Sequence, residues 1–450
     1  MTEPSSREDG PSGQVRRPRG WLLAGCLVMA FAARLGFGLT SEFWGDDERQ
    51  VYLIGLEYFT TGEWPLYGPD VVYTETRIPG ALQALLVGGP LRLVQQPEAP
   101  YVLLNLLSFG ALAWLSWYIC RRLPRVPWWC VWFWVLFSPW SLDVSAHIIN
   151  TSYVAFGAVL FCIAIFEIDP ALTHRIVRPA VAWFALGFGM LWIAQLHLSA
   201  SLLGPIAAVV ITRALLRDWR RVLNGAPWLA AGMALGATTL VPTVMTVGLS
   251  SLASRTGANV TFVPANLLRL PQVAAQFFSF GSFELPRFIG ASTDERLAFL
   301  ARYPWAAPAV VFSVAAAIAQ VLALATVGLA RGSQRQPDWR AVRNTTWLLL
   351  LFVYLSFTLS VKAPASHAFY AMMPVVTIYA FYCWEPWLAR KPARILAASL
   401  LVAGAISHIA IASRNFTDRS LYVDRPLVMR ALQERNYHLV GERRTEFWKR

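Results

Sequence analysis

Long apolar runs recur along the chain, and short clusters of arginine separate them. Most runs are close to the ~20 residues that an α-helix needs to cross a membrane. The pattern predicts an all-α polytopic membrane protein with about eleven transmembrane helices. The predicted spans are residues 21–40, 100–120, 127–143, 147–166, 180–196, 198–214, 227–249, 304–330, 345–361, 367–388 and 395–412. Residues 80–94 are apolar but barely long enough to cross, so we predict a re-entrant or surface-lying segment there.

The arginine clusters predict the orientation of these spans, because cytoplasmic loops carry an excess of Lys and Arg. With the amino terminus in the cytoplasm, every cluster between spans falls on the cytoplasmic side, from Arg121 and Arg122 to Arg390 and Arg394. The arginine-rich tail is the exception, because this assignment places it outside. It also carries many acids, and a small folded appendage there would weaken the charge rule.

Three regions are expected from this topology. Residues 1–18 form a disordered cytoplasmic tail, residues 19–412 form the transmembrane domain, and residues 413–450 form a small tail on the outer face. The first run lacks a small-residue cleavage site, so it is predicted to be an uncleaved span. Two long outer loops are expected, at 41–99 and 250–303.

The loops and the tail also contain local signals. Apolar residues at helical spacing predict an interfacial helix from Asp47 to Phe59, and Gly62 to Pro69 has the composition of a turn. The loop 250–303 is read as polar. Its arginines, Arg287 among them, are expected to line the side of a substrate site on which the second substrate, the acceptor, binds. In the tail, Pro426 to Glu434 predicts a short helix, and Tyr437 to Val440 an extended segment.

Composition agrees with a membrane protein and excludes several other classes. The chain is 56% hydrophobic and 14% charged, with a mean hydropathy of +0.46. Its net charge of +13 lies in loop clusters rather than in a stripe with interleaved aromatics, so it does not indicate a nucleic-acid partner. The five cysteines form no CxxC pair and no zinc-ligand spacing.

One polar stretch stands out against this background. Asp46, Asp47 and Glu48 are consecutive acids that follow the first span directly. Adjacent carboxylates repel one another and have no packing role at a membrane boundary. A solvated loop start is the simplest explanation, and a catalytic loop on the outer face is the alternative.

Three turns between later spans bring further polar residues to the same predicted face. They carry Asp143, His147 and Asn150; Gln195, His197 and Ser199; and Lys362, His367 and Tyr370. A carboxylate beside them can act as a general base, and cationic or hydrogen-bonding side chains can hold a departing phosphate. The chain has no glycine-rich phosphate loop and no large cytoplasmic domain, so a nucleotide donor is not indicated.

The stretch from Trp44 to Tyr52, directly after a first span, resembles the GT-C superfamily of integral-membrane glycosyltransferases. The nearest branch is that of the bacterial relatives of protein O-mannosyltransferases and lipid A aminoarabinose transferases. In those families an Asp-Glu pair opens the first outer loop. Asp47 and Glu48 match that pair, and the resemblance implies Asp47 as catalytic base with Glu48 as its partner or as an acceptor contact. The extra acid, Asp46, leaves the match ambiguous by one residue.

Other segments carry the resemblance less specifically. Gln195 to His197 and His367 to Tyr370 look like family segments that lie near the lipid phosphate. The family's His-Pro-Pro segment reads Arg77 Ile78 Pro79 Gly80 here, so no role is transferred to that His, and Arg77 is a candidate phosphate contact. The predicted donor-phosphate or substrate-binding residues are Arg77, His147, Gln195, His197, Lys362, His367 and Tyr370.

The resemblance implies transfer of a sugar from a polyprenyl phosphate to an acceptor hydroxyl, with inversion, on the outer face of a bacterial plasma membrane. The expected partners are membrane lipid, a lipid-linked sugar donor and a glycan, lipid or protein acceptor. A divalent cation at Asp46, Asp47 and Glu48 stays open. A transporter or flippase of lipid-linked sugars is the alternative, and a non-catalytic membrane scaffold is a third hypothesis.

Overall fold

The protein is described from a computed structural model, which covers residues 20–42, 44–70, 77–248, 262–330, 338–359, 365–418 and 421–444. The elements in chain order are α1 (Gly20–Ser41), α2 (Asp46–Thr61), β1 (Tyr67–Asp70), β2 (Arg77–Pro79), α3 (Leu82–Leu93), α4 (Ala99–Arg122), α5 (Trp128–Phe137), α6 (Pro139–Ala146), α7 (Val154–Ile168), α8 (Pro179–Ala194), α9 (Ala200–Arg217), α10 (Trp219–Ala237), α11 (Val241–Val247), η1 (Pro264–Arg269), α13 (Leu270–Ser279), α14 (Pro286–Ile289), α15 (Thr293–Arg302), α16 (Ala307–Leu329), α17 (Trp339–Thr358), η2 (Ser366–Met372), α18 (Met373–Leu388), α19 (Lys391–Asp418), α20 (Leu421–Gln433) and η3 (Tyr437–Leu439). The predicted all-α class is confirmed, with one small antiparallel hairpin of β1 and β2.

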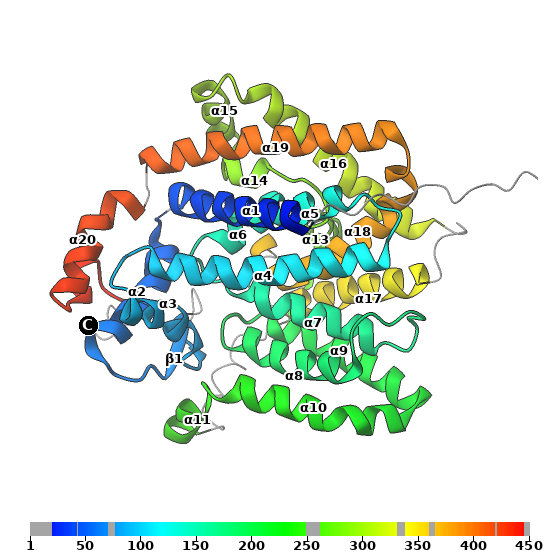
Figure 1. Cartoon of the computed structure of the whole chain (residues 1–450), viewed down its shortest axis with the longest axis horizontal. Coiled ribbons are helices and arrows are strands. Elements are labelled where there is room, and N and C mark those ends of the chain that lie inside the picture. The colour runs from blue at the N-terminus through cyan, green and yellow to red at the C-terminus, as the bar shows by residue number, and fades with distance from the viewer. Residues whose placement is uncertain are drawn as a thin grey trace, which may run out of the picture.

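Six described helices are long and apolar enough to cross a membrane, namely α1, α4, α9, α16, α17 and α19, and the bent pair α10 and α11 makes a seventh if it counts as one span. Four shorter apolar helices, α3, α5, α7 and α8, lie among them. Every predicted span contains a helix, but the count of eleven stays a prediction. Side-by-side packing of these helices forms a bundle (Figure 1).

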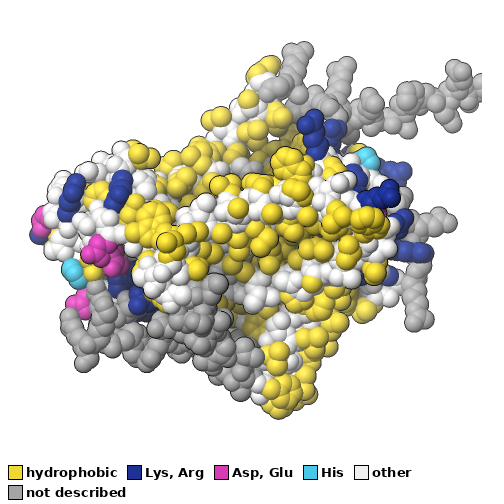
Figure 2. Space-filling view, turned by 90° about the horizontal axis from the view of Figure 1, so that it is seen from below, with side chains coloured by type: hydrophobic (Ala, Val, Ile, Leu, Met, Phe, Trp, Pro, Cys, Tyr) yellow, Lys and Arg dark blue, Asp and Glu magenta, His cyan; other side chains and the backbone are white. Residues whose placement is uncertain are grey.

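The surface has the pattern expected of an integral membrane protein. Figure 2 shows a broad hydrophobic band between two ends where charged side chains gather. Large apolar side chains of other helices are exposed as well, including Met29 of α1, Ile318 and Leu322 of α16 and Val402 of α19. Such an extensive apolar surface is stable only when lipid covers it.

The two ends of the bundle differ in charge. One end, called the arginine end, joins the loops that contain the predicted cytoplasmic clusters. Arg122 binds both Glu167 (2.6 Å) and Asp338 (3.1 Å), and Arg213 binds Asp169 (3.3 Å). These contacts connect α4, α7, α9 and α17. Arg122 and Arg213, from two of the predicted clusters, therefore lie at one end together with the segment that carries Asp338, as their positions in the sequence predict.

The other end, called the α2 end, carries α2, α3, the hairpin and α20 (Figure 1). The predicted helix from Asp47 to Phe59 is confirmed as α2, which ends where Gly62 adopts a left-handed conformation (φ 75°). It crosses α3 closely at two glycines. A Cβ on Gly88 would lie 2.4 Å from the Gly55 carbonyl oxygen, so only glycine allows this approach. The crossing holds α2 in place.

The carboxyl-terminal tail packs against the first loop at the α2 end. Arg425 binds Glu98 (2.6 Å), Arg443 binds Glu57 (2.8 Å), and Arg444 contacts Asp47. The arginines that seemed misplaced by the charge rule are thus paired with acids of residues 41–99. This pairing explains why a basic tail lies on the same side as an acidic loop.

Several predicted boundaries differ from the structure. The span at 127–143 is two helices, because Pro139 follows Ser138, whose side chain caps α6. The span at 147–166 begins as a helix only at Val154, and α19 continues to Asp418, beyond the predicted domain boundary at 412.

Two of the sequence-based descriptions are wrong. Residues 262–303 of the supposed polar loop form η1, α13, α14 and α15, and Phe277 and Phe278 of α13 are buried in the bundle. The aromatic run is too short to be recognised as a span, so its burial was missed. The segment expected to be extended at 437–440 is the 3₁₀ turn η3, in which Asn436 accepts a hydrogen bond from the His438 N–H.

Candidate functional site

The consecutive acids form the first turn of α2. Gly45 precedes them in an extended conformation as N-cap, so the free N–H groups of the turn favour negative charge there. The Asp47 side chain is 53% exposed and pairs with Arg444. The backbone of Asp46 belongs to the same turn, but its side chain lies outside the described residues.

Glu48 has a different environment from Asp47. Burial and the nearby charges of Asp47 and Asp143 together raise the pKa of the Glu48 carboxyl from its ordinary value of 4.5 to about 7, against the lowering effect of hydrogen bonds from the Gly45 and Glu48 backbone. A carboxyl with this pKa changes its protonation state near neutral pH. It can therefore accept a proton during a reaction.

Asp143 and His147 lie at the end of α6, facing the end of α1. His147 Nδ1 is 2.8 Å from the Asp143 carbonyl oxygen and 3.7 Å from its carboxylate, and His147 Nε2 is 2.7 Å from Ser41 Oγ. The side chain is buried. The turn after α6 thus meets the end of α1 through His147, and the Asp143 carboxylate interacts electrostatically with Glu48 of the acid turn.

Glu42 is a further acid of this cluster that received no role from the sequence. Its side chain is fully buried and accepts a hydrogen bond from the Ile148 N–H (3.2 Å). Burial and the charge of Glu48 raise its pKa well above the usual range. Its position between the first span and the acid turn was the available signal, because a carboxyl there costs free energy to bury.

Cationic side chains border the acids. The Arg287 guanidinium lies 5.5 Å from the centre of the Trp140 ring, and its Nη2 is 3.2 Å from His367 Nδ1. Arg414 donates to the Ile289 and Phe288 carbonyls (2.8 and 3.2 Å). Both guanidinium groups interact electrostatically with the Asp143 carboxylate. Arg287 was assigned to the acceptor side from the sequence, yet it contacts a predicted phosphate residue.

His197 and His367 come close enough to influence each other's charge. Burial, with the charge of His367, lowers the pKa of His197 to about 4. The Ser199 N–H donates to His197 Nδ1 (3.1 Å), which fits a neutral ring with its proton on Nε2. Two of the three predicted turns therefore meet at these histidines, with His197 as a neutral hydrogen-bonding group.

Other predicted residues lie elsewhere. Gln195 is buried against Gly80 and bonds to Gly236 and Thr239 (2.7 and 2.6 Å), which is a packing role. Arg77 is exposed on β2, 4.9 Å from the Tyr67 ring centre. Lys362 lies outside the described residues.

Tyr370 is buried deeper, and its hydroxyl has no hydrogen-bond partner among the described residues. The Tyr370 hydroxyl interacts electrostatically with the guanidinium of Arg34, a fully buried arginine of α1. Arg34 donates a hydrogen bond to Ser145 Oγ (2.8 Å). Arg34 received no role from the sequence, although an ionisable residue inside an apolar run is a recognised signal of function.

No group of three His, Cys, Asp or Glu side chains with the arrangement of a metal site occurs in the described part of the chain, which excludes the Asp46 side chain. A divalent cation at the acid turn thus stays a hypothesis.

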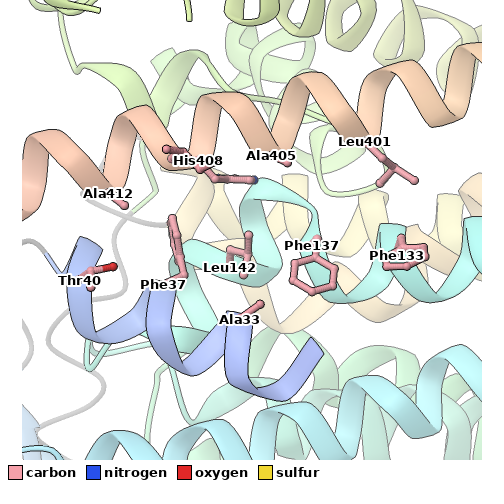
Figure 3. Close-up of a pocket in the computed structure, with 11 residues that line it drawn as sticks. Ala33, Phe37, Thr40, Phe133, Phe137, Leu142, Leu401, Ala405, His408 and Ala412 are labelled. Atoms are coloured by element: carbon pink, nitrogen blue, oxygen red, sulfur yellow. The ribbon is translucent and has the colours of Figure 1, made fainter. Parts of the chain in front are cut away.

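An apolar groove of about 440 Å³ runs beside the site between α1, α5, α6 and α19 (Figure 3). It is lined mostly by apolar side chains such as Phe133, Phe137 and Leu401, and Thr40 lies toward one end. Phe37 forms a wall shared with the site, because its ring packs 5.3 Å from both the His147 and the His408 ring centres. The groove therefore adjoins the polar cluster.

No protein-family model and no curated protein matches this chain. Among solved structures, it is similar to ArnT from Cupriavidus metallidurans, in the apo state and bound to undecaprenyl phosphate. Each shares 14% sequence identity and a TM-score of 0.48, and the match covers 94% of this chain and 78% and 77% of those chains, respectively.

Proposed function

We propose that this protein is a glycosyltransferase that moves a sugar from a polyprenyl-phosphate donor to an acceptor hydroxyl, with inversion at the anomeric carbon. The observation that carries the proposal is that the Asp143 carboxylate interacts electrostatically with two opposite kinds of group. One is the Glu48 carboxyl with its pKa of about 7, and the other is the pair of guanidinium groups of Arg287 and Arg414. A proton acceptor thus lies next to a phosphate-binding group.

The acid side supplies the base. As the acceptor oxygen attacks the anomeric carbon, its proton passes to a carboxylate of the α2 turn. Glu48 suits this role because its pKa is near the operating pH. Asp47, the base implied by the resemblance, is the alternative, and its pairing with Arg444 would leave it to orient the acceptor.

The cationic side stabilises the leaving group. As the bond between the anomeric carbon and the phosphate oxygen breaks, the phosphate gains negative charge. Arg287 can offer N–H groups to it, with His367 and neutral His197 nearby as further hydrogen-bonding groups. Arg414 contributes charge, while its N–H groups hold α14 in place through the carbonyls of Phe288 and Ile289.

The apolar groove suits the lipid part of the donor. A polyprenyl chain gains free energy by leaving water for an apolar surface, at roughly 25 cal/mol per Å². A chain in the groove beside Phe37 would keep its phosphate near the polar cluster. This arrangement accounts for a site built at the end of a membrane bundle.

The orientation completes the proposal. Because arginine clusters mark the cytoplasmic side, the α2 end faces outward from a bacterial plasma membrane. The active site then faces the outer surface, the side on which a glycan, lipid or protein acceptor would be modified.

The test is sugar transfer in proteoliposomes that contain synthetic polyprenyl-phosphate sugars and candidate acceptors, followed by mass spectrometry of the released polyprenyl phosphate. We expect release with at least one donor, and loss of release in both Asp47→Asn and Glu48→Gln. Full activity of both variants would contradict the base assignment. Movement of the lipid-linked sugar across the bilayer without release would instead favour the transporter or flippase.

A further inference from the structure

A second pocket, with a partly polar lining, lies at the arginine end. It is at the opposite end of α10 from the α2 end. It has a volume of about 420 Å³ and opens between the first turns of α8 and α10. Its polar lining comes from Asp218, Arg220, Arg221 and Asn224, and Trp183 and Trp228 complete it. The candidate catalytic residues take no part in this pocket.

The pocket has an excess of donors. Arg220 and Arg221 face one carboxylate, Asp218, whose oxygen already accepts the Arg221 N–H (3.2 Å) as the N-cap of α10. Trp183 is only 1% exposed, and its indole lies against Gly225 in the pocket lining, where a Cβ on Gly225 would be 2.2 Å from Trp183 Nε1. The indole N–H therefore adds a donor to the lining beside the two guanidinium groups, and a ligand with several acceptor oxygens matches this set of donors.

The neighbouring cations repel one another. Arg221 Nη2 donates to the Glu167 carbonyl (3.3 Å), and Arg175 donates to the same oxygen. Like charges this close lower the pKa of Arg175, together with its burial. A bound anion would relieve this repulsion. The first turns of α8 and α10 add the positive ends of two helix dipoles.

The surroundings of the pocket are apolar and exposed. Leu216 is 82% exposed, Trp219 and Leu223 are 56% exposed, and Trp228 is 50% exposed. Tryptophans of this kind lie at the level of lipid headgroups in membrane proteins, and leucines lie against acyl chains. A free phosphate would use only the polar part of this site, whereas a phospholipid would use both parts.

We propose that this pocket binds the phosphate headgroup of an anionic phospholipid of the inner leaflet, with its acyl chains over Leu216 and Leu223. The phosphate oxygens accept hydrogen bonds from Arg220, Asn224 and the Trp183 indole. Arg221 contributes charge while it remains bound to the Glu167 carbonyl. Basic pockets between helices on the cytoplasmic side are suited to such headgroups.

The experiment measures lipid binding to the full-length detergent-solubilised protein by native mass spectrometry, with phosphatidylglycerol and phosphatidylcholine as probes. We expect phosphatidylglycerol to bind more tightly. The double variant Arg220→Ala, Asn224→Ala should bind it about tenfold more weakly, a loss of roughly one charge-assisted hydrogen bond. The matched control is Arg340→Ala, an exposed arginine at the same end but on α17, which should bind normally.

Trp183→Phe gives an independent test that preserves the ring. It should weaken phosphatidylglycerol binding several-fold, with an unchanged unfolding temperature. Equal binding of both lipids, or equal weakening by Arg340→Ala, would overturn the proposal. A further outcome would also overturn the proposal: excess inorganic phosphate displaces phosphatidylglycerol and itself stays bound to the protein. The ligand of the pocket would then be a free anion and not a lipid.

Discussion

The guanidinium of Arg444 contacts the carboxylate of Asp47, although the two residues are almost a whole chain apart. The contact continues a series in which Arg443 pairs with Glu57 and Arg425 with Glu98. The tail therefore follows the first loop and neutralises its acids one after another. Asp47 is consequently oriented by the tail, while Glu48 faces the interior.

The first prediction separates these tail arginines. The Arg443 side chain is 5% exposed and lies 3.8 Å from the Asp70 carboxylate, which is 11% exposed, so Arg443→Ala should cost about 2–3 kcal/mol of stability because it leaves that carboxylate without its cation. Arg444 pairs with an exposed carboxylate, so Arg444→Ala should cost less than about 1 kcal/mol. Thermal unfolding of the purified protein in detergent compares the two. Equal destabilisation would contradict this account of the tail.

The second prediction concerns the pH dependence of transfer. With the pKa of Glu48 at about 7, its base form accumulates as pH rises, so activity should increase through pH 7 and then level off. Glu48→Gln should reduce the transfer rate by about 10²-fold or more. Asp47→Glu retains a carboxylate and should preserve the midpoint. A transfer rate of the parent enzyme that does not change between about pH 5.5 and about pH 8.5 would contradict Glu48 as the base.

The third prediction concerns the stability of the protein, which should depend on pH because of the same shift in the pKa of Glu48. Folding raises the pKa of Glu48, so the stabilisation by its protonated form is complete below about pH 4.5 and is lost as pH rises through about 7. Glu48→Gln stays neutral, so it should be more stable than the parent at pH 8 by about 1–3 kcal/mol. The difference should disappear at acidic pH. Unfolding temperatures at several pH values measure this.

The fourth prediction addresses Arg287. Arg287→Ala should reduce donor turnover by about 10²-fold, because one guanidinium near the leaving phosphate is lost. Arg287→Lys should recover only part of this activity, because an ammonium lacks the planar donor pair. Arg302→Ala, which breaks the exposed pair with Asp418, is the control and should keep full activity. Comparable losses in the control would point to a general surface effect.

The fifth prediction uses two adjacent glycines of α3. A Cβ on Gly88 would lie 2.4 Å from the Gly55 oxygen, whereas a Cβ on Gly89 meets nothing within 4 Å. Gly88→Ala should therefore destabilise the protein by about 1–3 kcal/mol and displace the acid turn of α2. Gly89→Ala should be neutral or slightly stabilising. Unfolding temperature and transfer rate together check this, and similar behaviour of the two variants would contradict the crossing.

The periodic parts of the fold were predictable from the sequence. Apolar runs of span length and the arginine clusters between them predicted where helices lie and which loops share an end, as the Arg122 to Asp338 contact confirms. Breaks within helices were harder. The Ser138-Pro139 break depends on one cap, and α13 depends on packing of Phe277 against distant helices, which no local pattern reports.

The site was predictable only in part, because long-range contacts determine its chemistry. The sequence indicated that the turns at His147, His197 and His367 lie near the acids. The resemblance implied Asp47 as the base and Glu48 as its partner, whereas the difference between their environments comes from burial, from Asp143 and from Arg444, which no local motif reports. Glu42 and Arg34 were missed because each is a single ionisable residue, one directly after the first apolar run and one inside it, and neither matches a motif.

The most direct test of the proposed function is an experimental structure of the protein with a non-hydrolysable polyprenyl-phosphate sugar analogue. The account predicts the phosphate within hydrogen-bonding distance of Arg287, the lipid chain in the groove beside Phe37, and space for an acceptor oxygen between the anomeric carbon and the Glu48 carboxylate, about 3 Å from each. A phosphate bound at the arginine end, or an anomeric carbon more than roughly 10 Å from both Asp47 and Glu48, would contradict it.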